Sequence, residues 1–279
     1  MSERVAVLTD STAYLPDGVA EKYGITVVPL HVMLGERSVL EGVDLTPAEF
    51  AVWITAPGRA ATTSQPSPAA FAAALDGLET DQVVAVHMSS KLSGTANAAR
   101  LAGEASARTV RVVDSQSTAM GLGFAVIAAA EAAAMDADIE EVARAATDAA
   151  ARTRTLFYVD TLEYLRRGGC IGAAAALFGT ALSVKPLLEV LDGAIVPIEK
   201  VRTASRAIQR LEDVAVEHAG EQPVDIAVHH LASAERATAL AERLRSRVAG
   251  LQSLYASEVG AVVGAHAGPG VLGIVVHLR

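Results

Sequence analysis

The chain has 279 residues, with 23 Lys and Arg against 32 Asp and Glu and a net charge of −9. This length can bury a sizeable core without disulfides or structural metal, and the negative charge opposes non-specific binding to nucleic acid or to an anionic membrane. The single cysteine, Cys170, excludes an intrachain disulfide and an all-thiolate zinc site.

The first ten residues hold no apolar signal-peptide core and run directly into a strand-like segment. Together with the single cysteine, this indicates a reducing, cytoplasmic location.

The first half of the chain alternates short β-branched runs with longer helical stretches. Strands are predicted over 5–8, 83–88 and 110–114, followed by helices over 17–23, from Gly94 to about 107, and over the alanine-rich stretch 119–135. The alanine-rich stretch is slightly short for a bilayer span of ~20 residues and contains Glu131, so we expect a buried helix there. Three such βα units predict a parallel sheet with right-handed crossovers.

The second half alternates differently. After a helix that ends near Arg152, strands are predicted over 155–160, 194–200, 224–229, 251–257 and 271–278, and helices over 161–167, 203–219 and 234–248. We therefore expect two α/β domains, at residues 1–152 and 153–279. No low-complexity linker separates them, so we expect them to be joined tightly.

Four segments concentrate Ser, Thr and Gly near predicted strand ends: 9–12, 62–67, 89–95 and 114–117. In open parallel sheets ligands bind beyond the carboxyl ends of the strands, so the three segments that follow strands are expected to share one crevice. Such residues are also ordinary helix caps and turn formers. Segment 89–95 is the strongest candidate, because Ser93 and Gly94 lie at a predicted helix start, which favours an anion.

His266 lies in a glycine-rich stretch, 264–270, near the end of the chain. A lone histidine is often structural, but glycines allow close approach of backbone and ligand, and a loop position favours function. We interpret His87, His229 and His230 as structural.

Basic residues lie beside turns in two places of this acidic chain, at 166–167 and at 200–202. They could face an anionic ligand or an acidic partner, or they could be solvated surface charges.

Several familiar chemistries lack their motifs. The sequence contains no Gly-x-x-x-x-Gly-Lys-Ser/Thr phosphate loop, no His-Glu-x-x-His or Cys-x-x-Cys metal spacing and no Gly-x-Ser-x-Gly elbow, so we expect neither a bound metal nor a cofactor. One enzymatic alternative stays open. Ser93, His266 and Asp10 could be the nucleophile, base and orienting acid of a serine hydrolase or acyltransferase.

Taken together, these segments resemble the DegV family, whose members include the fatty-acid-binding subunit of bacterial fatty acid kinase, called FakB. The resemblance covers nearly the whole chain. It rests on Thr9-Asp10-Ser11-Thr12, Thr63-Ser64-Gln65-Pro66-Ser67, Ser89-Ser90-x-Leu92-Ser93-Gly94-Thr95, Val113-Asp114-Ser115, Asp160-Thr161-Leu162-Glu163-Tyr164-Leu165, Lys185-Pro186 and Gly264-x-His266-x-Gly268-Pro269-Gly270.

The resemblance implies two α/β domains, the first with a mostly parallel sheet and the second with a mixed sheet, enclosing a long-chain fatty acid such as a C16 to C18 acid. It implies that a separate ATP-binding kinase subunit phosphorylates the carboxylate, so that this chain binds lipid without being catalytic. The implied fatty-acid-binding residues are Thr63, Ser64, Ser93, Gly94 and His266, and the partner-facing ones are Arg167, Lys200 and Arg202.

One motif departs from the family pattern. Where the family commonly has Gly-Gly-Arg-Ile-Ser, this chain has Gly168-Gly169-Cys170-Ile171-Gly172. A cation that could pair with the head group or with the kinase subunit is therefore replaced by a thiol. A lipid carrier with no kinase partner stays open as a further alternative.

Overall fold

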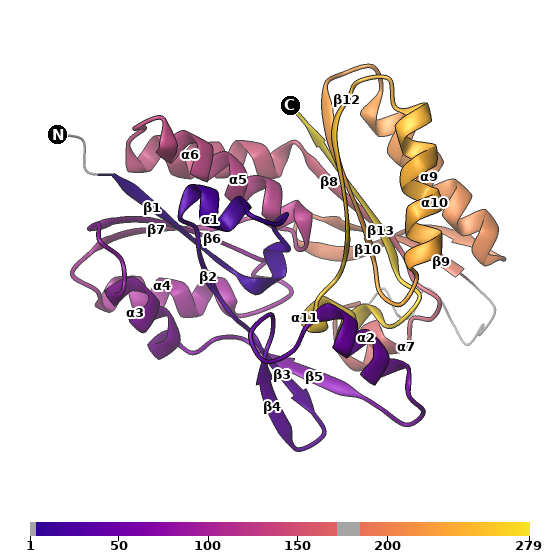
Figure 1. Ribbon diagram of the computed structural model, residues 1–279, viewed down its shortest axis with the longest axis horizontal. Helices are drawn as coiled ribbons and strands as arrows, with labels where there is room; N and C mark the ends of the chain where they lie inside the picture. The colour runs from indigo at the N-terminus through magenta and orange to yellow at the C-terminus, as the bar shows by residue number, and fades with distance from the viewer. Residues whose placement is uncertain (1–3, 172–184) are drawn as a thin grey trace.

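The computed structural model describes residues 4–171 and 185–279, which form three sheets with surrounding helices (Figure 1). The N-terminal sheet has four parallel strands in the order β2-β1-β6-β7. Its strands are β1 (Val5–Asp10), β2 (Thr26–Val28), β6 (Gln82–His87) and β7 (Thr109–Asp114). The predicted parallel sheet is confirmed. His87 pairs with Asp114 in this sheet, so the carboxyl ends of β6 and β7 lie at one edge.

Two helices cover each face of this sheet (Figure 1). Helices α3 (Pro68–Asp76) and α4 (Thr95–Ala105) pack on one face, and α5 (Met120–Ala134) and α6 (Ile139–Ala151) pack on the other. The expected alanine-rich helix is α5, and small side chains on both α5 and α6 let the two pack closely. Within the described residues, no helix is long and apolar enough to cross a membrane.

A small antiparallel sheet follows β2 and was not predicted from the sequence. It has the order β4-β3-β5 and consists of β3 (His31–Leu34), β4 (Arg37–Leu40) and β5 (Ala61–Ser64). Helix α2 (Pro47–Thr55) connects β4 to β5 and starts with a capping box between Thr46 and Glu49. The short helix α1 (Val19–Tyr23) precedes β2.

The C-terminal sheet has six strands of mixed direction in the order β10-β9-β8-β13-β11-β12, as the family resemblance implied. The strands are β8 (Thr153–Tyr158), β9 (Lys185–Leu191), β10 (Ala194–Val201), β11 (Val224–His230), β12 (Leu251–Glu258) and β13 (Leu272–Leu278). Strand β9 was not predicted from the sequence.

The two faces of this sheet have different partners. Leu156, Tyr158 and Ile274 face α9 (Ala204–Ala219) and α10 (Ala234–Arg247) in one apolar core. The opposite face contacts α5, where Met120 and Phe124 pack on Val275. Helix α5 packs on both large sheets and therefore holds them together. The division into two domains after residue 152 stays a prediction.

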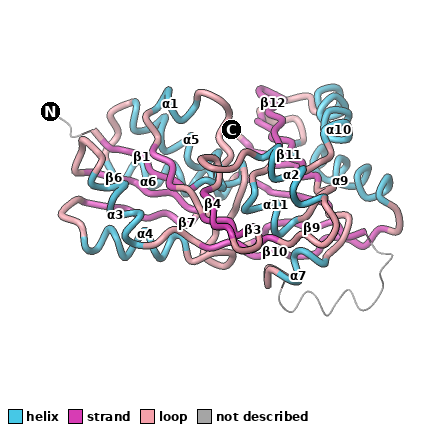
Figure 2. Tube along the Cα trace, turned by 60° about the horizontal axis from the view of Figure 1, so that its bottom comes forward, coloured by secondary structure: helices cyan, strands magenta, loops and turns pink. Residues whose placement is uncertain are grey.

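Two short helices complete the region between the sheets, α7 (Glu163–Arg167) and α11 (Ala261–Ala267). Helix α11 packs against α2, α7 and β5, and Figure 2 shows it beside α2 in the middle of the molecule. Elements that are far apart in the sequence, from α2 to α7, therefore meet around α11.

Candidate functional site

A cavity of about 500 Å³ lies between the C-terminal sheet, α11 and the ends of β5 and β6. Most of its wall is apolar. It is lined by Leu30, Thr63, Ser64, Gln65, Met88, Leu92, Ser93, Gly94, Thr118, Ala119, Thr155, Leu156, Phe157, Leu165, Gly168, Cys170, Val190, Ile195, His229, Val259, Val262, Val263, His266, Ala267, Val271, Gly273 and Val275.

All five residues that the resemblance implied for the site lie in this one wall. They come from three separate elements: Thr63 and Ser64 end β5, Ser93 and Gly94 precede α4, and His266 is on α11. The expected loop position of His266 is therefore wrong, because it lies in the last turn of this helix. The structure therefore brings these five residues into the wall of one mostly apolar cavity.

His266 connects two of these elements through its ring nitrogens. Nε2 lies 2.8 Å from the Thr63 hydroxyl, and Nδ1 lies 3.4 Å from the Cys170 sulfur. Burial lowers the pKa of His266, so the ring is neutral near pH ~7. Gly168 leaves room for this arrangement, since a Cβ at that position would lie 2.0 Å from Nδ1.

The segment that carries Ser93 is fixed by its own hydrogen bonds. The Ser93 hydroxyl lies 2.8 Å from that of Thr95 and also accepts a hydrogen bond from the Thr95 backbone N–H. Gly94 lies against the Gln65 amide, because a Cβ there would lie 2.1 Å from Oε1 of Gln65. The backbone of Gly94 therefore stays close to the end of β5.

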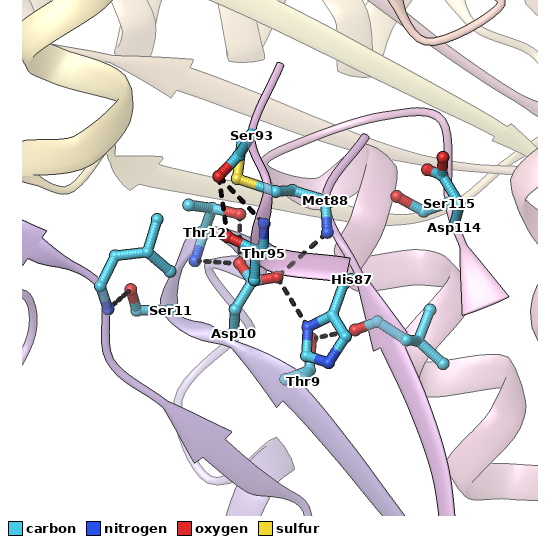
Figure 3. Close-up of polar contacts among 12 residues, drawn as sticks. Thr9, Asp10, Ser11, Thr12, His87, Met88, Ser93, Thr95, Asp114 and Ser115 are labelled. Carbon is cyan, nitrogen blue, oxygen red and sulfur yellow. Dashed lines mark hydrogen bonds and ion pairs between the residues drawn. The ribbon is translucent and has the colours of Figure 1, made fainter. Parts of the chain in front are cut away.

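Asp10 holds Met88, the residue before the 89–95 segment, by a hydrogen bond (Figure 3). Its carboxylate accepts hydrogen bonds from the Met88 backbone N–H and from Nδ1 of His87, each at 3.0 Å, and from Thr12. Burial raises the pKa of Asp10, but these hydrogen bonds and the nearby His87 together hold it below its ordinary value. The 9–12 segment is thus part of the scaffold that places Met88 and the residues after it.

Asp114 has a similar supporting role at the end of β7. Its carboxylate accepts hydrogen bonds from the Ser90 hydroxyl and the Ser90 backbone N–H. Segments 9–12 and 114–117 therefore hold the 89–95 segment, and no residue of either lines the cavity. The expectation that these three segments share one crevice is wrong for this cavity, because two of them support the third from outside it.

Helix α11 is held at its N-terminus by groups far away in the sequence. Glu41 accepts a hydrogen bond from the Val262 N–H at 2.7 Å, and the Tyr14 hydroxyl accepts one from the Val263 N–H at 3.2 Å. Burial raises the pKa of Glu41 to about 7, although hydrogen bonds from Ser11, Val262 and Tyr14 oppose the rise. Because α11 carries His266, these contacts set the position of the imidazole.

The floor of the cavity is one face of the C-terminal sheet. Phe157 and Val275 supply apolar surface, and Gly273, which pairs with Phe157, adds no side chain to the floor. His229 also lines the floor, but both of its ring nitrogens have partners, at Ser257 and at the Met120 backbone N–H. Burial lowers the pKa of His229 to about 4, which fits the structural role we predicted for it.

The hydrolase alternative requires Ser93, His266 and Asp10 to act together. Among the hydrogen bonds of residues 4–171 and 185–279, none joins any two of these three side chains. Ser93 bonds to Thr95, His266 to Thr63 and Cys170, and Asp10 to His87.

The basic residues proposed to face a partner lie outside the cavity wall. Arg167 is exposed and forms an ion pair with Glu163 on α7. Lys200 and Arg202 are exposed at the end of β10 that pairs with the start of β9, which is the same end of the sheet as α7. Gly172 of the departing motif lies outside the described residues.

No lysine or arginine lines the described cavity wall. The segment 172–184 contains no Lys, Arg or His in the sequence. Within the part of the chain that the structure describes, no group of three or more His, Cys, Asp or Glu is arranged to hold a metal ion.

Sequence reasoning missed several residues of this site. Glu41 has no recognisable motif, and its role depends on the small antiparallel sheet, which was not predicted. Gln65 belongs to a motif on which the family resemblance rests, and Gly168 belongs to the motif that departs from the family pattern. The sequence did not predict that Gln65 contacts Gly94 or that Gly168 contacts His266.

Comparison with known proteins places the chain among close relatives. A model described as "Uncharacterised protein, DegV family" matches residues 4–279. A DegV domain-containing protein of Streptomyces coelicolor is 54% identical over 282 residues, covering 100% of both chains.

Two solved structures are similar along the whole chain. One is DegV from Bacillus subtilis, described as a fatty acid binding protein, with a TM-score of 0.92 and 33% identity, covering 100% of both chains. The other is a DegV family protein from Thermus thermophilus, also described by its fatty acid binding, with a TM-score of 0.90, 32% identity and coverage of 99% of this chain and 100% of that one.

Proposed function

Because the chain belongs to the DegV family, we propose that it binds one long-chain fatty acid, such as a C16 to C18 acid, in the cavity around His266. The observation that carries this proposal is the wall itself, which is apolar over most of its surface and includes the hydrogen-bonded pair Thr63 and His266 together with the Ser64 and Ser93 hydroxyls. The Bacillus subtilis and Thermus thermophilus proteins, described by their fatty acid binding, support it.

The apolar wall accounts for affinity. Burying an acyl chain of ~14 methylenes contributes roughly 11 kcal/mol before the costs of association, at ~0.8 kcal/mol per methylene. A cavity of about 500 Å³ is within the range of small-molecule sites, roughly 300 to 1,000 Å³. Phe157, Val263 and Val275 are among the side chains that would contact the acyl chain.

The polar part accounts for orientation. In this proposal the carboxylate accepts hydrogen bonds from Thr63, Ser64 and Ser93, beside Gly94 and His266. Each hydrogen bond to a charged group contributes roughly 1.5 to 3 kcal/mol, which offsets the cost of removing the carboxylate from water. The first turn of α4 begins after Gly94, and its dipole favours a negative charge there.

The chain acts in this proposal as a non-catalytic, substrate-presenting protein. A separate ATP-binding kinase subunit would phosphorylate the carboxylate to an acyl phosphate, which agrees with the lack of a nucleotide phosphate loop in this sequence. Arg167, Lys200 and Arg202 would face that subunit, because they are exposed at the same end of the C-terminal sheet. Opposite charge on the partner would then speed association.

A binding titration tests the first part. Delipidated protein titrated with palmitate and stearate in a calorimeter should bind one molecule per chain. The proposal would be contradicted if the titration releases no heat and the added fatty acid displaces no fluorescent probe from the protein.

Reconstitution tests the second part. The loaded protein is mixed with an ATP-binding fatty acid kinase subunit and ATP, and acyl phosphate is trapped as the hydroxamate with hydroxylamine. Hydroxamate that depends on all components supports presentation to a kinase. Fatty acid that stays bound and unmodified with functional kinase subunits would indicate a carrier that has no kinase partner.

A further inference from the structure

Cys170, His266 and Thr63 form a continuous hydrogen-bonded row in the cavity wall. The Cys170 sulfur lies 3.4 Å from Nδ1 of His266, and Nε2 of the same ring lies 2.8 Å from the Thr63 hydroxyl. All three residues line the cavity. The imidazole therefore has one partner on each nitrogen.

A neutral imidazole carries one proton, so this row allows two arrangements. In the first, the thiol donates to Nδ1 and Nε2–H donates to the Thr63 oxygen, which leaves the Thr63 hydroxyl proton free. In the second, Nδ1–H points at the sulfur and the Thr63 hydroxyl donates to Nε2, which uses up its only proton. Burial lowers the pKa of His266 and raises that of Cys170, so both groups are in their neutral forms near pH ~7.

Acceptor strength separates the two arrangements. One ring nitrogen accepts a hydrogen bond in both arrangements, so they differ in the group that accepts the ring N–H. In the first it is the Thr63 hydroxyl oxygen, which is a good acceptor, and in the second it is the Cys170 sulfur, which is a weak one. The thiol has a second acceptor within reach, the Gly168 carbonyl oxygen, but that contact is longer, at 3.6 Å. Gly168 also limits movement of the ring, because its backbone lies against Nδ1. The first arrangement is therefore favoured.

We propose that Cys170 is a positioning residue that fixes the His266 proton on Nε2, so that the Thr63 hydroxyl donates its proton to the head group of the ligand. This inference rests on the proposed function for the identity of that head group. A carboxylate can only accept hydrogen bonds, so it needs a hydroxyl whose proton is free. With no lysine or arginine in the described wall, the orientation of each neutral donor matters more.

The tautomer of His266 can be measured directly in the ligand-free protein. The seven histidines are labelled with ¹⁵N, and long-range ¹H–¹⁵N correlation spectra are recorded, with the His266 signals assigned from a His266→Gln variant. The wild-type spectrum should show a protonated Nε2 and an unprotonated Nδ1. A protonated Nδ1 in the wild type would overturn the proposal without any variant.

Two substitutions at Cys170 separate positioning from packing. Cys170→Ala removes the donor, so His266 should shift toward the Nδ1–H tautomer and fatty acid affinity should fall about tenfold, near the lower limit for the loss of one hydrogen bond to a charged group. Cys170→Ser keeps a donor and should restore both. An unchanged tautomer in the folded Cys170→Ala protein would overturn the proposal.

The readouts distinguish this inference from the proposed function. The tautomer is recorded without ligand, so it reports on Cys170 even if the chain binds no fatty acid. The expected tautomer with no fatty acid binding would contradict only the proposed function, whereas fatty acid binding with the opposite tautomer would contradict only the role of Cys170.

Discussion

The His266 imidazole lies 2.8 Å from the Thr63 hydroxyl, although the two residues are 203 positions apart in the chain. Thr63 belongs to β5 of the small antiparallel sheet, and His266 belongs to α11 beside the C-terminal sheet. Both residues line the cavity, so the site depends on the correct packing of both halves of the protein.

The Thr63 hydroxyl should contribute to ligand affinity more than to folding. Replacing it in Thr63→Val should weaken fatty acid binding by about 1.5 to 3 kcal/mol, because a hydrogen bond to the charged head group is lost. Thr62→Val is the matched control, since Thr62 is exposed on the same strand and does not line the cavity. Displacement of a fluorescent fatty acid measures both variants, and equal affinities in the two would remove Thr63 from the site.

Gly168 should be required for the position of His266. A Cβ at Gly168 would lie 2.0 Å from Nδ1, so Gly168→Ala should displace the ring and lower fatty acid affinity at least tenfold, or about 1.4 kcal/mol. The control is Gly77→Ala, where the nearest atoms would be at ordinary contact distance, 3.6 Å or more. Calorimetric titration checks both; a Gly168→Ala protein that binds like the wild type would show that the ring position is unimportant.

Gly273 should set the length of the acyl chain that fits. It lies in the floor of the cavity, and a Cβ there would make ordinary contacts, the nearest being 3.5 Å from Cβ of His229. Gly273→Ala should therefore fold normally, while Gly273→Leu should fill part of the cavity and shift preference toward shorter acids. Competition among C12 to C18 acids measures the preference. If the Gly273→Leu variant keeps the wild-type preference among these acids, the acyl chain does not lie over Gly273.

Glu41 should make stability depend on pH. The pKa of Glu41 rises from 4.5 to about 7 on folding, so the folded protein binds this proton more tightly than the unfolded chain does. The resulting stabilisation is complete below the unfolded pKa and is lost as pH rises through about 7. A shift of this size corresponds to about 3 kcal/mol.

Glu41→Gln tests this linkage, because the amide resembles the protonated carboxyl and has no ionised form. From about pH 5 to about pH 8 the variant should gain stability relative to the wild type in denaturant unfolding. The control is Glu49→Gln, since hydrogen bonds to Thr46 lower the pKa of the exposed Glu49, and no such gain is expected. Parallel pH profiles for wild type and Glu41→Gln would contradict a raised pKa.

Local patterns in the sequence were enough to predict most of the two large sheets. The β-branched, apolar run 83–88 favours a strand and the alanine-rich stretch 119–135 favours a helix, and they form β6 and α5. Strands β3, β4 and β5 are short, at four residues each, and their side chains are of mixed polarity, so local patterns could not indicate them.

Long-range contacts within the site could not be predicted in the same way. The motifs around Thr63, Ser93 and His266 marked residues that now share one cavity wall, but they did not indicate which atoms meet. The contact of Cys170 with Nδ1 of His266 depends on the turn after α7, and the bond from Val262 to Glu41 depends on how α11 packs. Neither contact has a local signal in the sequence.

The most direct test of the central claim is the identity of the small molecules that the protein retains from the cell. Protein purified without added lipid is denatured, extracted with organic solvent and analysed by mass spectrometry, alongside a Thr63→Val, Ser93→Ala double variant. The account predicts C16 to C18 fatty acids in the wild type, near one per chain, and strong depletion in the double variant. A wild-type protein that holds no fatty acid and does not take up added palmitate would contradict it.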